Sequence, residues 1–113
     1  MGMSFDSPQY GEVSAGQPAL AGERRAYLTA LDAAVVARGG MSCGVVPRAG
    51  TPVLHVINAE SPRRSVEVGC DFVDGAWRFV WAATGETIGP VDDATGVVDA
   101  IARSLGTHAG VIR

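Results

Sequence analysis

The sequence contains no lysine, and its nine basic residues are all arginines distributed along the chain. We attribute this imbalance, like the abundance of alanine, glycine and valine, to GC-rich coding. Acidic residues lie between the arginines, and the net charge is −3. Proteins that bind nucleic acid directly usually present a clustered basic face to several phosphates. The charge distribution therefore argues against a nucleic-acid partner.

Long apolar runs are also absent, and no stretch approaches the roughly 20 apolar residues of a membrane-spanning helix. The first 19 residues lack the basic start and apolar centre of a secretion signal. Hydrophobic residues nevertheless make up 47% of the 113 residues and charged residues 19%, which is too apolar for a disordered chain. We therefore expect one domain with its own core, no association with membranes and a cytoplasmic location.

Cysteine is scarce: Cys43 and Cys70 both lie in apolar runs typical of strands. A buried free thiol is the usual state of such a residue, and a disulfide is not expected in the cytosol. Metal sites usually show pairs of ligands at close spacing, and the sequence has none. His55 and Cys70 would be neighbours in one possible strand register, but a histidine hydrogen-bonded within the core is the simpler interpretation. We predict no metal and no cofactor.

Signatures of catalysis are missing as well. The acidic residues Asp71, Asp74, Asp92 and Asp93 each have a local role as ion-pair partner, turn residue or helix cap. The segment 85–90 has two glycines before a helix but no lysine of a phosphate-binding loop. Carboxylates at the start of that helix would also repel phosphate. The sequence therefore favours a protein that is not an enzyme.

The most informative segment is 65–83, in which apolar and polar residues alternate on both sides of Asp74-Gly75. An Asp-Gly pair between alternating runs predicts a β-hairpin with a type I′ turn. This turn places Phe72 opposite Trp77 and Val68 opposite Trp81. The predicted core face then carries Val66, Val68, Cys70, Phe72, Trp77, Phe79 and Trp81, and the other face carries Glu67, Asp71 and Arg78.

Two further strands are predicted before this hairpin, at 42–48 and 52–59. Pro47 cannot donate a ladder hydrogen bond, so the first of them should be an edge strand. The length of the loop that follows leaves the register of the second strand open. With an even number of loop residues, His55 and Ile57 share the core face of the hairpin, and Leu54 and Val56 point outward. An odd number inverts this assignment.

Helices are predicted at both ends of these strands. The first runs from Pro18 to about Arg38, and the second begins at Asp92 or Asp93 and ends at Gly106; both carry apolar residues at helical spacing. We divide the chain into a loose arm (1–17), one domain (18–106) and a tail (107–113). The predicted fold is α+β, a two-layer sandwich in which an antiparallel meander of four or five strands is flanked by N- and C-terminal helices (α-β-β-β-β-α).

Two candidate sites follow from the predicted faces. On the outer face, a small apolar centre bordered by charge is typical of a protein interface, although an N-terminal arm with Phe5 and Tyr10 could also cover it. Its candidate residues are Leu54, Val56, Val80, Ala82 and Arg78. On the inner face, an aromatic pocket for a small molecule is the alternative to plain core packing. Its candidate residues are His55, Trp77 and Trp81.

The W-x-F-x-W run from Trp77 to Trp81 and the Gly-Pro-Val-Asp-Asp junction at 89–93 accompany the order helix, strands, helix. Together they resemble small actinobacterial proteins, some of them encoded beside helix-turn-helix regulators. The layout of residues 20–106 also resembles the type III secretion chaperone family, whose members dimerise and bind other proteins. This resemblance implies a chaperone-like or regulatory accessory protein that binds a protein partner as a homodimer. A small-molecule-binding protein or small enzyme is the alternative.

Overall fold

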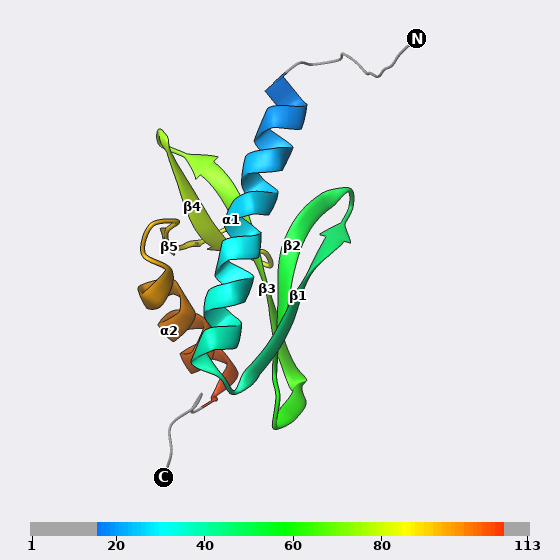
Figure 1. Cartoon of the computed structure of the whole chain (residues 1–113), viewed down its shortest axis with the longest axis vertical. Helices are drawn as coiled ribbons and strands as arrows, with labels where there is room; N and C mark the ends of the chain where they lie inside the picture. The colour runs from blue at the N-terminus through cyan, green and yellow to red at the C-terminus, as the bar shows by residue number, and fades with distance from the viewer. Residues whose placement is uncertain (1–15, 108–113) are drawn as a thin grey trace.

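The computed structural model describes residues 16–107, with side chains from residue 22 onward (Figure 1). In chain order the elements are α1 (Gly16–Arg38), β1 (Met41–Arg48), β2 (Thr51–Asn58), β3 (Ser61–Val73), β4 (Ala76–Trp81), β5 (Thr87–Pro90) and α2 (Ala94–Leu105). The strands form one antiparallel sheet in the order β1-β2-β3-β4-β5. The predicted α+β meander is confirmed, with the fifth strand present. Most of the expected arm, including Phe5 and Tyr10, and residues 108–113 lie outside the described residues.

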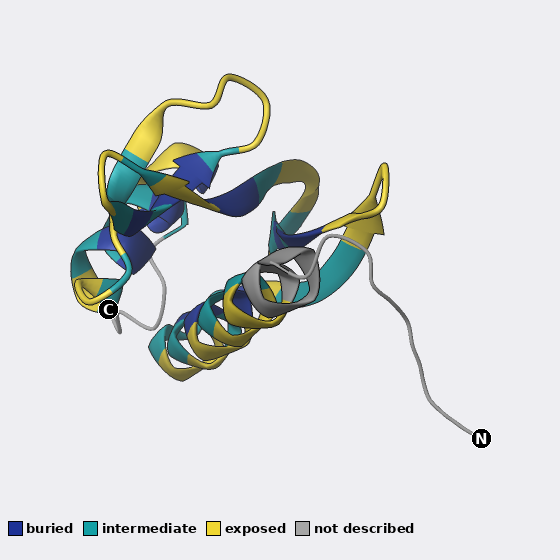
Figure 2. Cartoon of the chain, turned by 90° about the horizontal axis from the view of Figure 1, so that it is seen from above, coloured by how far each residue is buried: buried dark blue, intermediate teal, exposed yellow. Residues whose placement is uncertain are grey.

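Both helices pack against the same face of the sheet, which we call the inner face. Helix α1 lies over β1, β2 and β3, and α2 lies over β2, β3 and β5 beside α1. Buried residues, dark blue in Figure 2, occur on the strands and on the packed sides of the helices. The largest fully buried side chains are Phe79, Leu28, Leu31, Leu54, Ile101, Leu105, Val35, Val56, Val68, Val97 and Cys70.

The helices begin and end at residues with suitable local chemistry. Helix α1 ends at Arg38, and the following Gly39 and Gly40 both have positive φ. At the start of α2, the Asp93 side chain accepts a hydrogen bond from the Gly96 backbone N–H, and Gly106 adopts the left-handed conformation after its last turn. Among the described residues, neither helix combines the length and apolarity needed to cross a lipid bilayer.

The central hairpin has the predicted register. Val68 lies opposite Trp81, Cys70 opposite Phe79, and Val73 opposite Ala76. Both turn residues have positive φ, 53° at Asp74 and 81° at Gly75, as a type I′ turn requires. The sequence pattern therefore determines this hairpin because the turn and the alternation agree.

The register of β2 is the odd one of the two alternatives. Leu54 lies opposite Val68 and Val56 opposite Val66, so Leu54 and Val56 face the core with 0% exposure. A β-bulge between Ile57 and Asn58 shifts the pairing before the turn. The assignment of Leu54 and Val56 to the outer face is therefore wrong.

The side chain of Asn58 stabilises this bulge and connects it to α2. Its Oδ1 accepts hydrogen bonds from the backbone N–H groups of Glu60 and Ser61, at 2.8 and 3.2 Å. Its Nδ2 donates to the carbonyl of Leu105 at 3.0 Å. Asn58 is the one buried polar residue among those described, and these bonds satisfy both ends of its amide.

Strands β2 and β3 separate at the end near the β1–β2 turn, because their pairing stops at Leu54 and Val68. Arg24 from α1 lies at this gap. Its Nε donates to the Cys70 carbonyl at 2.7 Å, and its Nη2 lies 3.6 Å from an Asp71 carboxylate oxygen. Its guanidinium also lies 5.7 Å from the Trp77 ring centroid. Arg24 therefore joins α1 to the β3–β4 hairpin where β2 no longer pairs with it.

Candidate functional site

The outer face of the sheet points away from both helices. It is formed by the alternate side chains of each strand that do not enter the core. Its apolar members are Val46, Val53, Ile57, Val80 and Ala82, and its charged members are Arg48, Glu67, Asp71 and Arg78. Val53 and Val80 are only 6% and 4% exposed, although they lie on this face. The outer face is therefore mixed in chemistry, with small apolar areas between charges.

The interface residues predicted from sequence are only partly brought together. Val80 and Ala82 lie on or beside the outer face as expected, and Arg78 lies there with its Nε donating to the Val73 carbonyl at 3.4 Å. Leu54 and Val56 lie in the core instead. Their places on the outer face are taken by their neighbours Val53, His55 and Ile57.

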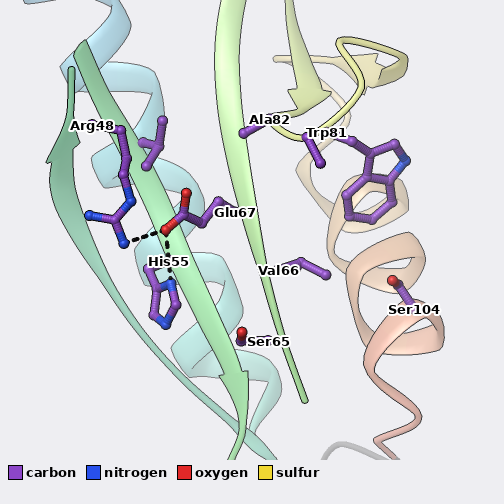
Figure 3. Close-up of a pocket in the computed structure, with 10 residues that line it drawn as sticks. Arg48, His55, Ser65, Val66, Glu67, Trp81, Ala82 and Ser104 are labelled. Carbon is purple, nitrogen blue, oxygen red and sulfur yellow. Dashed lines mark hydrogen bonds and ion pairs between the residues drawn. The ribbon is translucent and has the colours of Figure 1, made fainter. Parts of the chain in front are cut away.

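Of the predicted pocket residues, two line a common hollow and one does not. His55 and Trp81 both line an open hollow of about 650 Å³ (Figure 3). Trp77 is 9% exposed and packs in the core, with its ring centroid 5.5 Å from that of Tyr27 and 5.6 Å from that of Phe72. The core interpretation therefore holds for Trp77.

The hollow reaches around an edge of β3. Strand β4 pairs with β3 only from Val68 onward, so the first half of β3 has β2 as its sole strand neighbour in the described sheet. Figure 3 shows Glu67 and His55 on one side of β3, with Val66 and Trp81 on the other. Ser104 of α2 completes the inner side. A hollow lined from both faces of a sheet is possible here because the sheet ends at this edge.

A charged network lies on the outer side of the hollow. One Glu67 carboxylate oxygen accepts hydrogen bonds from Arg48 Nη2 at 2.5 Å and from His55 Nδ1 at 3.2 Å. Glu67 stands opposite His55 on neighbouring strands, and Arg48 reaches it from the end of β1. The hydrogen bond from Arg48, with a smaller contribution from His55, lowers the pKa of Glu67 below its usual value. Glu67 therefore remains ionised and holds Arg48 and His55 together.

Ser65 and Ser104 line the hollow, but in residues 22–107 His55 makes its side-chain hydrogen bond to Glu67 and not to a hydroxyl. A serine nucleophile would need such a bond to its base. The described side chains also hold no group of three or more potential metal ligands.

The two cysteines are free thiols that lie away from the hollow. Burial raises the pKa of Cys43 and of Cys70 to about 12 in each case, so both remain protonated and weakly nucleophilic at neutral pH. Cys70 faces the core, whereas His55 faces outward. The register in which these two residues would be neighbours is therefore wrong.

Sequence reasoning did not find the network of Arg48 and Glu67. The available signal was weak, because a lone arginine before a turn and a lone glutamate in a strand are common on solvated faces. A scan against family models and searches of curated proteins and solved structures found no match for the chain. Function is therefore inferred from the outer face and the hollow.

Replacing Glu67 with glutamine is expected to flatten the dependence of stability on pH. Because the folded pKa of Glu67 lies below its unfolded value, its contribution is full above about pH 4.5 and is lost as the pH falls through the lowered pKa. For this partly exposed pair we expect about 0.2–1 kcal/mol. Urea unfolding at pH 6 and pH 3 should show a smaller loss in Glu67→Gln than in the wild type.

Glu86→Gln is the matched control. Glu86 is exposed and forms no ion pair with any described residue, so its variant should follow the wild-type profile. Equal slopes for Glu67→Gln and the wild type would contradict a stabilising role for the network.

Proposed function

We propose that this chain is a protein-binding accessory or regulatory module that acts as a dimer through the outer face of its sheet. The observation that carries the proposal is the one-sided packing of the fold. Both helices lie on the inner face, and none of the elements in residues 16–107 covers the outer face. A mixed surface of small apolar areas and charges is typical of non-obligate interfaces.

Two shallow areas on this face provide apolar contacts. One surrounds Gly44, where no atom lies within 4 Å of an added Cβ, and it is lined by Val46 and Ile57. The other lies where β2 and β3 separate and is lined by Val53, Gly69 and Val80, and by Arg24 of α1. The charged network of Glu67 lies beside both. A second copy placed about a two-fold axis would bury the same areas against each other, which is the simplest self-complementary arrangement.

The sequence resemblance to type III secretion chaperones supports the same proposal, because members of that family dimerise and bind other proteins. A second candidate is a small-molecule-binding protein. It is favoured by one observation, the hollow of about 650 Å³ that His55 and Trp81 share. Such a volume is within the range of ligand sites. Substitutions on the outer face should impair the protein-binding dimer, whereas substitutions in the hollow should impair small-molecule binding.

The dimer is tested by placing a charge on the outer face. Ile57 is half-buried, and its side chain lines the shallow area around Gly44. The Ile57→Glu variant should dissociate at least about tenfold more readily than the wild type, because paired glutamates would be buried at the interface. Sedimentation equilibrium over a wide concentration range, with circular dichroism to verify folding, measures this change.

Thr29→Glu, on the exposed side of α1, is the matched control and should dimerise like the wild type. A wild-type chain that remains monomeric at the highest concentration would contradict dimerisation. A dimer that Ile57→Glu leaves intact would place the interface on another surface.

A further inference from the structure

Strand β3 has a free edge in its first half. It runs from Ser61 to Val73, but β4 pairs with it only from Val68. The Ala82 N–H donates to the Glu67 carbonyl at 2.9 Å, so the backbone groups of Glu67 point away from β2. Because this direction alternates along a strand, the N–H and C=O of Ser65 point the same way. The β3–β4 pairing begins only at Val68, and outside the strand ladders no backbone hydrogen bond to Ser65 is found among the described residues.

The space beside this edge is open. The hollow of about 650 Å³ is lined by Ser65, Val66 and Glu67 along the strand and by Trp81 beyond it. Val66 and Trp81 form an apolar wall on the inner side, as Figure 3 shows, and Ser104 of α2 lies below them. An added strand would therefore place its inward side chains against an apolar surface.

Two arginines lie in the first half of β3, at this edge. Arg63 and Arg64 are both exposed, and neither pairs with a carboxylate within the described part of the chain. The Arg64 side chain donates to the Leu105 carbonyl at the end of α2 at 3.4 Å, so it lies on the inner side and Arg63 is the arginine without a described polar partner. Glu67 is already neutralised by Arg48. The potential along this edge therefore favours an acidic partner.

A second copy of the chain does not fit this edge. If two β3 edges paired in antiparallel fashion about Ser65, Glu67 of the second copy would lie opposite Arg63. Each Glu67 carbonyl already accepts the N–H of its own Ala82. Ala82 of the second copy would then occupy the position of Arg63. The edge therefore requires a partner strand that has no residue of its own chain, such as Ala82, hydrogen-bonded beside it.

We propose that the free edge of β3 is a strand-addition site for an extended partner segment in which acidic and apolar residues alternate. The added strand bonds through its backbone to Ser65, with apolar side chains on Val66 and Trp81 and acidic side chains toward Arg63. This inference rests on the proposed protein-binding function and names the class of partner. The strand-addition site binds through backbone groups at a strand edge, whereas the proposed dimer interface uses side chains of the outer face.

The probe is a short fluorescein-labelled peptide of alternating valine and aspartate, added to the full chain and followed by fluorescence anisotropy. We expect saturable binding, with amide shifts at Ser65 and an indole shift at Trp81 in nitrogen-15 spectra. The Ser65→Pro variant removes the edge N–H and should weaken binding at least about tenfold. The Ser65→Thr variant retains it and should bind like the wild type.

Charge is tested in the same titration. The Arg63→Glu variant should weaken binding roughly tenfold, because the aspartates would then meet a like charge. Arg25→Glu, on the exposed side of α1, is its control and should leave binding unchanged. A peptide with lysine in place of aspartate should bind at least about tenfold more weakly than the probe. Equal binding of both peptides would overturn the acidic specificity.

Three outcomes would overturn the strand-addition site. They are the absence of saturable binding, full binding by folded Ser65→Pro, and slow hydrogen exchange of the Ser65 amide without peptide, which would mean that the chain itself covers the edge. If Ser65→Pro does not fold, a probe N-methylated at alternate residues replaces it and should not bind.

The same samples separate this inference from the proposed function. If the chain forms a dimer that depends on Ile57 but does not bind the peptide, the outer-face interface is supported and the strand-addition site is refuted. A monomeric chain that binds the peptide at Ser65 retains the strand site and loses the dimer.

Discussion

Replacing Trp77 with alanine is expected to lower the free energy of unfolding by about 3–5 kcal/mol. The ring is 9% exposed and packs with the rings of Tyr27 and Phe72. It also lies under the guanidinium of Arg24, so its removal leaves a cavity where α1 joins the β3–β4 hairpin. Urea unfolding followed by circular dichroism measures the loss.

Trp81→Ala is the matched control for this prediction. Trp81 belongs to the same strand and faces the same side of the sheet, but it is only partly buried and lines the open hollow. Water can fill the space that it leaves, so the loss should be clearly smaller than for Trp77. An equal loss in the two variants, or an unchanged midpoint for Trp77→Ala, would contradict the packing described here.

The central hairpin was predictable because two local signals agree. The alternation of residues 65–83 defines which side chains share a face, and Asp74-Gly75 defines which residues oppose each other. The helices were predictable for a similar reason. Leu28, Leu31 and Val35 recur at helical spacing, and all three are fully buried.

The register of β2 was not predictable because it depends on a contact that is distant in sequence. The bulge at Asn58 is held by the bond from its side chain to the Leu105 carbonyl, 47 residues away. Nothing in the local pattern indicates this partner. Either alternate set of β2 residues contains enough apolar side chains to form a core face, so hydrophobicity alone did not decide between Leu54 and His55.

The hollow was anticipated in part. The sequence pattern predicts that His55 and Trp81 share the inner face, but they line the hollow from opposite faces of the sheet. They line one hollow because the pairing of β4 with β3 ends at Val68 and Trp81, which leaves the first half of β3 without this neighbour. The length of a strand relative to its neighbour is a property of the whole sheet, and a single segment does not reveal it.

A glutamate at Val56 should abolish the folded state, whereas a glutamate at the adjacent Ile57 should not. Val56 is 0% exposed between α1 and the sheet. An unpaired carboxylate there would cost several kcal/mol, a large part of the roughly 5–15 kcal/mol that stabilises a typical domain. Ile57 points to the outer face, where a charge remains hydrated.

The pair of variants tests the register of β2 directly, because the two positions differ by one residue and exchange faces if the strand slips by one. Near-ultraviolet circular dichroism and amide dispersion in nitrogen-15 spectra should show a folded Ile57→Glu and a disordered Val56→Glu. The opposite result would mean that Val56 faces outward. The outer face would then contain Leu54 and Val56, and the strand that supports both the dimer interface and the Glu67 network would have to be assigned again.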